Sequence, residues 1–145
     1  MKARYETVIV APVTDVFAFY NDLNNLPRIT PMDAEIVDVQ GDMRAGTRIE
    51  LRVKMFLFWS TWIVRIQEHV PNRYFVDSQE QGPFARFRHR HEFIPQGDKT
   101  KLIDEIEFEL PLYPASWPVQ QWIAKPQLDA MFAYRHEQTK RFLEK

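Results

Sequence analysis

Two neighbouring segments with strict alternation of polar and apolar residues constrain the fold more than any other feature of the sequence. In Phe84–Ile94, arginines and a glutamate occupy the even positions from 86 to 92, and in Lys101–Leu110, glutamates occupy the odd positions from 105 to 109. Because successive side chains of a strand point to opposite faces, each segment is predicted to be a strand with one charged face. Burying an unpaired ion costs several kcal/mol, so the charged faces point to solvent.

The turn between these two strands fixes which residues face one another. A two-residue Gly97–Asp98 turn sets His91 opposite Asp104 and His89 opposite Ile106 on the inner face. Opposed side chains have Cβ atoms about 4.5–5.5 Å apart, so a hydrogen bond between His91 and Asp104 is predicted. On the outer face the same register predicts an exposed charge ladder of Arg86, Arg88 and Arg90 against Glu109, Glu107 and Glu105.

Five further segments have the composition of strands. Alternation places the odd face of Thr47–Leu57 inward. In the next segment, Trp59–Val70, the even face, which includes Trp62, is predicted to point inward. Because the connections are short, successive strands are expected to be antiparallel neighbours. The pattern leaves the position of the turn near Phe56–Ser60 open. The five strands are Tyr5–Ala11, Ala34–Gln40, Thr47–Leu57, Trp59–Val70 and Arg73–Glu80.

Helical spacing of apolar residues occurs on either side of these strands. A helix is predicted from Val13, followed by a short helix interrupted near Pro27 and Pro31. A long closing helix has Pro126 in its first turn, where the missing N–H has no helical partner to lose. The inward face of the closing helix is predicted to hold Leu128, Met131, Phe132, Arg135, Thr139 and Phe142.

Together these elements predict one α+β domain over residues 1–145. An antiparallel sheet of about seven strands curves around the long C-terminal helix, with two short helices after the first strand. Such a sheet and helix leave a space between them, which is the natural place for a ligand. The aromatic content of 14% suits a chain that lines this space with rings.

Composition excludes several kinds of site. The absence of cysteine excludes thiolate zinc sites, iron–sulfur clusters, cysteine nucleophiles and disulfides. The four glycines stand alone, so no dinucleotide or phosphate-binding motif is present. A net charge of −1 gives no general attraction to nucleic acid, and the longest uncharged run, Leu110–Ala124, is too short and proline-rich to span a bilayer. We therefore expect a cytoplasmic protein without a nucleic-acid partner.

Several motifs together resemble the SRPBCC superfamily, the START/Bet v 1-like "helix-grip" group that includes polyketide cyclases and lipid or quinone carriers. The motifs are Val10–Phe17, Leu26–Pro31, Gly82–Phe84, the spaced His89 and His91, and Asp104 in a strand that ends at Pro111. The resemblance covers nearly the whole chain and implies a deep apolar cavity between the sheet and the C-terminal helix. The stretch Met55–Trp59 departs from the family, where a turn with glycine or proline is common.

The inward faces define a candidate site. A ligand in the cavity is expected to contact Trp62, Phe87, His89, His91, Asp104, Phe108, Met131 and Phe132. Asp104 would fix the tautomer of His91 and raise its basicity; the alternative is that the two histidines are polar residues that brace two strands. A metal site would need a third ligand, and no pattern brings His69 or His136 near, so neither metal nor cofactor is expected. Tyr20, Tyr74 and Tyr134 are candidates for a hydroxyl that meets the ligand.

Three classes of function remain open from the sequence. The preferred prediction is a carrier or binding protein for a small hydrophobic molecule that is aromatic, lipid-like or polyketide-like. The first alternative is a cyclase or dehydratase in which His91, Asp104 and His89 act as acid and base next to a carbonyl. The second is an interaction module whose Trp117–Trp122 segment docks a partner or a membrane, although membrane contact is not predicted. A monomer and a homodimer both fit the sequence.

Overall fold

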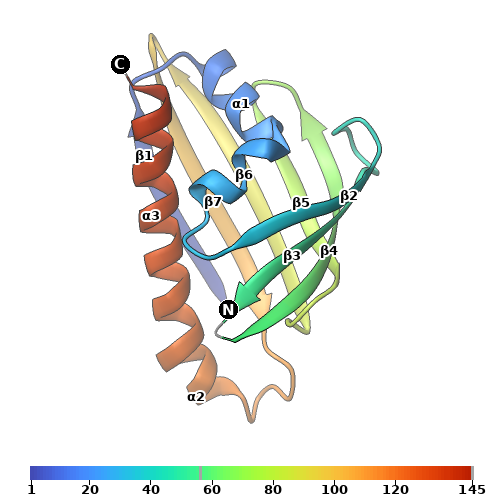
Figure 1. The fold of residues 1–145 in the computed structure, drawn as a ribbon. Coiled ribbons are helices and arrows are strands. Elements are labelled where there is room, and N and C mark those ends of the chain that lie inside the picture. The colour runs from blue at the N-terminus through green and yellow to red at the C-terminus, as the bar shows by residue number, and fades with distance from the viewer. Residues whose placement is uncertain (56, 145) are drawn as a thin grey trace.

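The chain folds into one antiparallel sheet that curves around a long helix (Figure 1). The computed structural model describes residues 1–55 and 57–144, where seven strands lie in the order β1-β7-β6-β5-β4-β3-β2. Short connections make successive strands neighbours, whereas β1 pairs with the distant β7. The predicted helix-grip architecture is confirmed. The strands are β1 (Lys2–Ile9), β2 (Ala34–Gln40), β3 (Arg48–Met55), β4 (Phe58–Val70), β5 (Tyr74–Gln81), β6 (Arg86–Gln96) and β7 (Lys99–Glu109).

The predicted register of β6 and β7 is confirmed. His91 faces Asp104 and His89 faces Ile106. The turn between the strands contains Gly97 at φ +66°, a left-handed conformation that favours glycine. The same register sets the three arginines of the outer face against the three glutamates, as expected.

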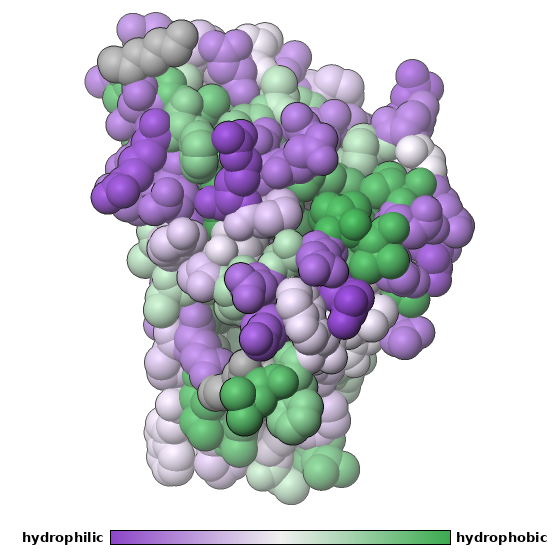
Figure 2. All heavy atoms as spheres, viewed as in Figure 1, coloured by the Kyte–Doolittle hydropathy of each residue, from purple (hydrophilic) through white to green (hydrophobic). Residues whose placement is uncertain are grey.

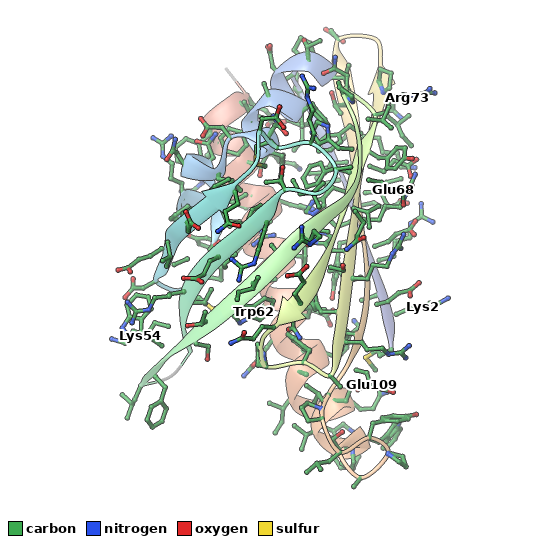
Figure 3. All side chains as sticks on the ribbon, turned by 90° about the vertical axis from the view of Figure 1, so that its right-hand side faces the viewer. Lys2, Lys54, Trp62, Glu68, Arg73 and Glu109 are labelled. Carbon is green, nitrogen blue, oxygen red and sulfur yellow. The ribbon has the colours of Figure 1, made fainter. Side chains whose placement is uncertain are left out.

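The charge ladder on the outer face is only partly formed. Arg86 contacts Glu109 across the strands at 3.6 Å. Arg88 instead contacts Glu68 of β4, and the guanidinium of Arg90 contacts Glu92 of its own strand. The prediction of three cross-strand pairs was therefore wrong, because long exposed side chains choose among several carboxylates for little energy. Figure 3 shows Glu68 projecting from this outer surface, together with Arg73 and Lys2.

Irregular pairing bends the sheet around the helix. The register shifts between Ile36 and Asp38 in β2, and again within β4 at Ile63/Val64 and Ile66/Glu68. Such bulges add local twist and curvature to a strand. The inner face of β4 is the even face, as predicted, with Trp62, Val64 and Ile66 turned toward the interior. The turn that the sequence left open lies between Met55 and Phe58, which pair with each other, and Phe56 falls outside the described residues.

Helices cover one face of the sheet. The segment predicted as a short helix near Pro27 consists instead of two 3₁₀ turns, because prolines at positions 27 and 31 interrupt the α-helical hydrogen bonds. The long helix runs along β1 and β7, and α1 lies near its C-terminal end (Figure 1). Among the described residues, no helix is both long and apolar enough to cross a membrane. The helical elements are α1 (Val13–Asn21), η1 (Leu23–Asn25), η2 (Pro27–Ile29), α2 (Trp117–Val119), the π-helical turn η3 (Gln120–Ala124) and α3 (Lys125–Leu143).

The buried apolar residues form three clusters around the interior. One joins α1 to β5, β6 and β7, with Phe17 and Phe93 at its centre. A second joins α3 to β1 and β7 through Phe132, which stacks on Tyr5 at 4.7 Å. The third lies on β3 and β4 around Ile66. The space between the three clusters is the site described next.

Candidate functional site

A cavity of about 380 Å³ lies between the inner face of the sheet and the helices. Its size is that of a site for a small organic molecule. Strands β3 and β4 supply aliphatic side chains to the wall, including Leu51, Val53 and Val64, and α3 supplies Met131. The wall is therefore mainly apolar, as a hydrophobic ligand requires.

Most of the predicted ligand contacts line this cavity, but two do not. Trp62, Phe87, His89, His91, Met131 and Phe132 all contribute to the wall. Asp104 is absent from the wall because it is fully buried behind the histidines. Phe108 is also absent, since it packs into the cluster that joins α3 to the sheet. Those two assignments as direct ligand contacts are thus corrected: inward orientation on β7 leads into the core rather than into the cavity.

The buried histidines of the wall belong to one cluster built on Asp104. Nε2 of His89 donates a hydrogen bond to Asp104 Oδ1 at 2.7 Å. Nε2 of His136, on α3, donates to Asp104 Oδ2, also at 2.7 Å. The expectation that nothing brings His136 near was wrong, because the closing helix lies directly over this part of β7. His69 does lie apart and contacts Asn21.

His91 has a different partner from the predicted one. Its Nε2 donates to Asp77 Oδ2 of β5 at 2.8 Å. Its Nδ1 lies 3.4 Å from Asp104 Oδ1 and makes no hydrogen bond. The His91 ring stacks on His89 at 3.5 Å and on Phe75 at 4.0 Å. Asp104 therefore accepts a hydrogen bond from His89, its diagonal neighbour in β6, and not from the opposed His91. The His89 imidazole is long enough to span this diagonal.

Burial and hydrogen bonding drive the pKa values of these groups in opposite directions. Burial favours the neutral form of Asp104, but the hydrogen bonds from His136 and His89 and the contact with His91 outweigh burial and hold its pKa well below the ordinary value. Burial and the charge of His91 lower the pKa of His89. Burial would also lower the pKa of His91, but its contacts with Asp104 and Asp77 raise it. Relative to an ordinary histidine, these shifts favour the neutral form of His89 and the protonated form of His91.

Asp77 and Arg135 complete the polar cluster on the cavity wall. Burial would raise the pKa of Asp77, but the hydrogen bond and charge of His91, with smaller contributions from His89 and Arg135, lower it. The Arg135 side chain comes from α3, is 8% exposed and lines the cavity. Its Nε has no hydrogen-bond partner, and its guanidinium lies 5.2 Å from the centre of the Phe132 ring.

Of the three candidate tyrosines, only Tyr20 lies in the cavity wall. Its hydroxyl pairs with Thr139 Oγ1 at 2.7 Å, and burial raises its pKa. Tyr74 donates to Glu68 on the outer face, and Tyr134 is partly exposed. Tyr20 is therefore the one of the three that lies beside the cavity.

The opening of the cavity lies beside the proline-spaced segment singled out in the sequence. Val119 and Ile123 are about half exposed and also line the cavity. Trp117 and Trp122, from the same segment, meet edge to face with ring centres 6.2 Å apart. Exposed Leu57 and Phe58 belong to the β3–β4 turn, which lies toward the same end of the molecule, where Figure 2 shows an apolar patch. Apolar side chains thus flank the cavity at this end of the molecule.

The cluster has one arrangement suited to binding a metal. Ligand atoms of Asp77, His89 and His91 lie within 4.8 Å of one another. Nε2 of each histidine already donates to a carboxylate, so a metal would have to be held by the Nδ1 atoms or displace those bonds. Chemically, the cluster offers hydrogen bonds, charge and one proton acceptor: with Nε2–H held by Asp104, the lone pair of neutral His89 is on Nδ1.

The sequence over residues 9–132 matches the family model described as polyketide cyclase / dehydrase and lipid transport. The chain belongs to this family. That membership agrees with the fold and with the SRPBCC resemblance of the sequence motifs. No curated protein shows significant sequence similarity to the chain.

Solved structures share the fold at low sequence identity. A START superfamily protein from Mycobacterium smegmatis superposes with a TM-score of 0.73 at 18% identity, over 99% of this chain and 97% of its own. The ZhuI aromatase/cyclase from Streptomyces sp. R1128 gives 0.71 at 16% identity, over 99% and 96%. Norcoclaurine synthase from Thalictrum flavum gives 0.73 at 17% identity, over 100% and 87%. At these identities the similarity shows the fold of this chain and no more. Its chemistry has to be argued from its own residues.

Three residues of the polar cluster were not predicted as site residues. Asp77 carried a usable signal, since it shares the inward face of its strand with Phe75. Arg135 was placed on the inward face of the closing helix, but a charged residue among apolar ones was not taken as part of a site. His136 carried no signal, because the position of a helix over a sheet depends on contacts distant in sequence.

Proposed function

We propose that this protein binds a small hydrophobic molecule in the cavity, with the polar group of the molecule at the histidine cluster, and serves as a carrier or binding protein. The observation that carries the proposal is an apolar cavity of about 380 Å³ with a cluster of buried histidines, Asp77 and Arg135 in its wall. A cavity of this kind binds the apolar body by removing its surface from water and fixes its orientation through the few polar contacts.

The arrangement of the cluster favours binding over chemistry. Asp104 and Asp77 each accept hydrogen bonds from histidines, so the side chains of the cluster are held in place without a ligand. A network of this kind holds donors in fixed positions for a ligand oxygen. The same groups need no change of protonation to do so.

The first experiment is a titration with N-phenyl-1-naphthylamine, an uncharged dye that fluoresces in apolar surroundings. We expect binding at one dye per chain and displacement by an uncharged hydrophobic competitor. Native mass spectrometry of the purified protein then identifies any molecule it retains. If saturating dye gives no increase in emission, the binding proposal fails and the interaction module becomes the better account.

One observation favours a second function, acid–base catalysis. Asp104 fixes the Nε2–H tautomer of His89, and Nδ1 of that ring makes no hydrogen bond within the described part of the chain. A base in this position would remove a proton next to a carbonyl, as a cyclase or dehydratase requires.

Proton exchange on a simple ketone separates the two functions. We expect 2-decanone in D2O to exchange the hydrogens beside its carbonyl at the same rate with wild type, with His89→Gln and without protein. A positioned base contributes about 10²–10⁴ in rate. Exchange that is accelerated by wild type and lost in His89→Gln, at unchanged dye affinity, would favour the enzyme.

A further inference from the structure

Arg135 is the one cation of the polar cluster that lacks a carboxylate partner among the described residues. Asp104 accepts hydrogen bonds from His89 and His136, and Asp77 accepts one from His91. These contacts occupy both carboxylates, and none of the described carboxylates lies within ion-pair distance of the Arg135 guanidinium. Arg135 is nevertheless 92% buried and faces the cavity, with Nε unsatisfied.

A buried guanidinium in this state is poorly compensated. Removing an ion from water is costly unless a partner and hydrogen bonds replace the water. The Phe132 ring lies near the guanidinium and gives a weak cation–π contact, but a ring cannot accept the in-plane N–H bonds. The missing partner must therefore be an acceptor that enters through the cavity.

Resting on the proposed function, we propose that Arg135 binds the carboxylate of a ligand whose hydrophobic body fills the cavity. The planar guanidinium presents parallel N–H donors that match the two oxygens of a carboxylate. The body of the ligand then lies against Leu51, Val53 and Val64, on the aliphatic part of the wall. The ligand class is a monocarboxylic acid with an apolar chain or ring system.

Asp77 is the group on the wall that opposes a bound anion. Its Oδ2 is held by Nε2 of His91 at 2.8 Å, so the two form a pair whose charges offset each other. If instead the role of Arg135 were to balance Asp77 at longer range, an anionic ligand would gain nothing over a neutral one. That difference is measurable.

The test displaces N-phenyl-1-naphthylamine from the protein at neutral pH with decanoate and, separately, with 1-decanol. The two competitors share their chain and differ in the polar end. We expect wild type to bind decanoate at least tenfold more tightly than 1-decanol. Charge-assisted hydrogen bonds have the strength to give tenfold to roughly hundredfold.

Two variants of α3 test whether Arg135 causes the preference for decanoate. Arg135→Met keeps the apolar stem and is expected to abolish the preference for decanoate, measured as the ratio of the decanoate and 1-decanol affinities within that variant. Arg141→Met is the matched control, because Arg141 lies in the exposed part of α3, where it pairs with Glu137, and it is expected to keep the full preference.

Each outcome has a defined meaning. Absence of dye binding to wild type would overturn the proposed function itself. Dye binding without a preference for decanoate would overturn the carboxylate inference alone, and this comparison needs no variant to fold. A preference that survives in a folded Arg135→Met would show that another group, such as His91, binds the anion, and would overturn the assignment to Arg135.

Discussion

Asp104 is the acceptor that connects the sheet to the closing helix at the level of single residues. It has no solvent exposure and receives hydrogen bonds from a strand histidine, His89, and a helix histidine, His136. Both oxygens of Asp104 accept from N–H groups, so the ionised side chain is favoured over the protonated one. Its removal affects two elements at once.

Asp104→Asn is expected to lower the free energy of unfolding by about 3 kcal/mol at neutral pH, because one amide oxygen replaces two acceptors of a buried ion. Since the folded pKa of Asp104 is depressed, its contribution is present above the ordinary pKa of about 4 and is lost as the pH falls through the folded value. Urea unfolding at several pH values measures both effects, and the deficit should narrow in acid. The control is Glu105→Gln, exposed on the opposite face, for which we expect a change under about 0.5 kcal/mol.

His91 gives the opposite dependence on pH. Asp77→Asn is expected to lower the pKa of His91, because an acceptor and a negative charge are removed. A raised folded pKa stabilises the protein below the unfolded value of about 6.5, and this stabilisation is lost as the pH rises through the folded value. The deficit of the variant should therefore be largest between about pH 4 and pH 6.5, because Asp77 itself is protonated in stronger acid. NMR titration of the imidazole protons reports the shift directly, with His69 as an unaffected reference; an unmoved His91 resonance would contradict the interaction.

These residue pairings mark how far the sequence leads. The alternation of charge in β6 and β7 and the turn at Gly97 sufficed to predict which residues face one another. They did not predict that His89 would be the residue that hydrogen-bonds Asp104, because this bond depends on how far the side chain extends toward its diagonal neighbour. They also did not predict Asp77 as the partner of His91, because that contact needs the register of a third strand.

At the scale of elements, the connection from β7 to α3 depends on a single buried amide. Gln120 is 2% exposed, and its Oε1 accepts a hydrogen bond from the backbone N–H of Leu110 at 3.2 Å. The residue also begins the π-helical turn whose Ile123 lies at the opening of the cavity. The bond thus ties the end of the sheet to the start of the helix.

Gln120→Ala is expected to cost about 1 kcal/mol of stability, since one neutral hydrogen bond is lost. The amide of Leu110 should exchange with solvent faster, while amides in the centre of β7 keep their protection. Hydrogen exchange followed by NMR measures both, and Gln121→Ala is the matched control. Equal protection of Leu110 in the two variants would rule out this connection.

Elements were predicted best where a periodic pattern coincides with a clear break. The strand Ala34–Gln40 agrees with the predicted bounds, and Pro126 lies in the first turn of α3 as expected. The short segment around Pro27 has no period of its own, and its two 3₁₀ turns are stabilised by local bonds such as that from Thr30 Oγ1 to the carbonyl of Leu26. Patterns of apolar residues do not report such bonds.

For the molecule as a whole, an apolar cavity that binds a ligand makes the stability of the fold depend on that ligand. Any ligand that binds only the folded state raises the free energy of unfolding, by about 2.7 kcal/mol at a hundredfold excess over its Kd. Thermal unfolding with and without N-phenyl-1-naphthylamine is expected to show this rise. The size of the shift gives the affinity independently of fluorescence.

Filling the cavity from within should remove that dependence. Val64→Phe places a ring on the inner face of β4, where Val64 lines the cavity, and is expected to weaken dye binding at least tenfold with a change in stability below about 1.5 kcal/mol. At a dye concentration thirty-fold above the wild-type Kd, the dye would then stabilise the variant far less than it stabilises wild type. Thr61→Phe adds the same ring on the exposed face of β4 and should leave dye binding unchanged.

The pairing of β1 with β7 sets the order of events during synthesis. The amino group of Met1 donates to the carbonyl of Phe108, 107 residues later, and every bond of β1 within the sheet is of similar range. At about 5–20 residues per second, the ribosome leaves β1 without its partner for several seconds. The apolar side chains of β1 are without their partners for that interval, so we expect the nascent chain to expose a surface of the kind that chaperones bind until β7 has emerged.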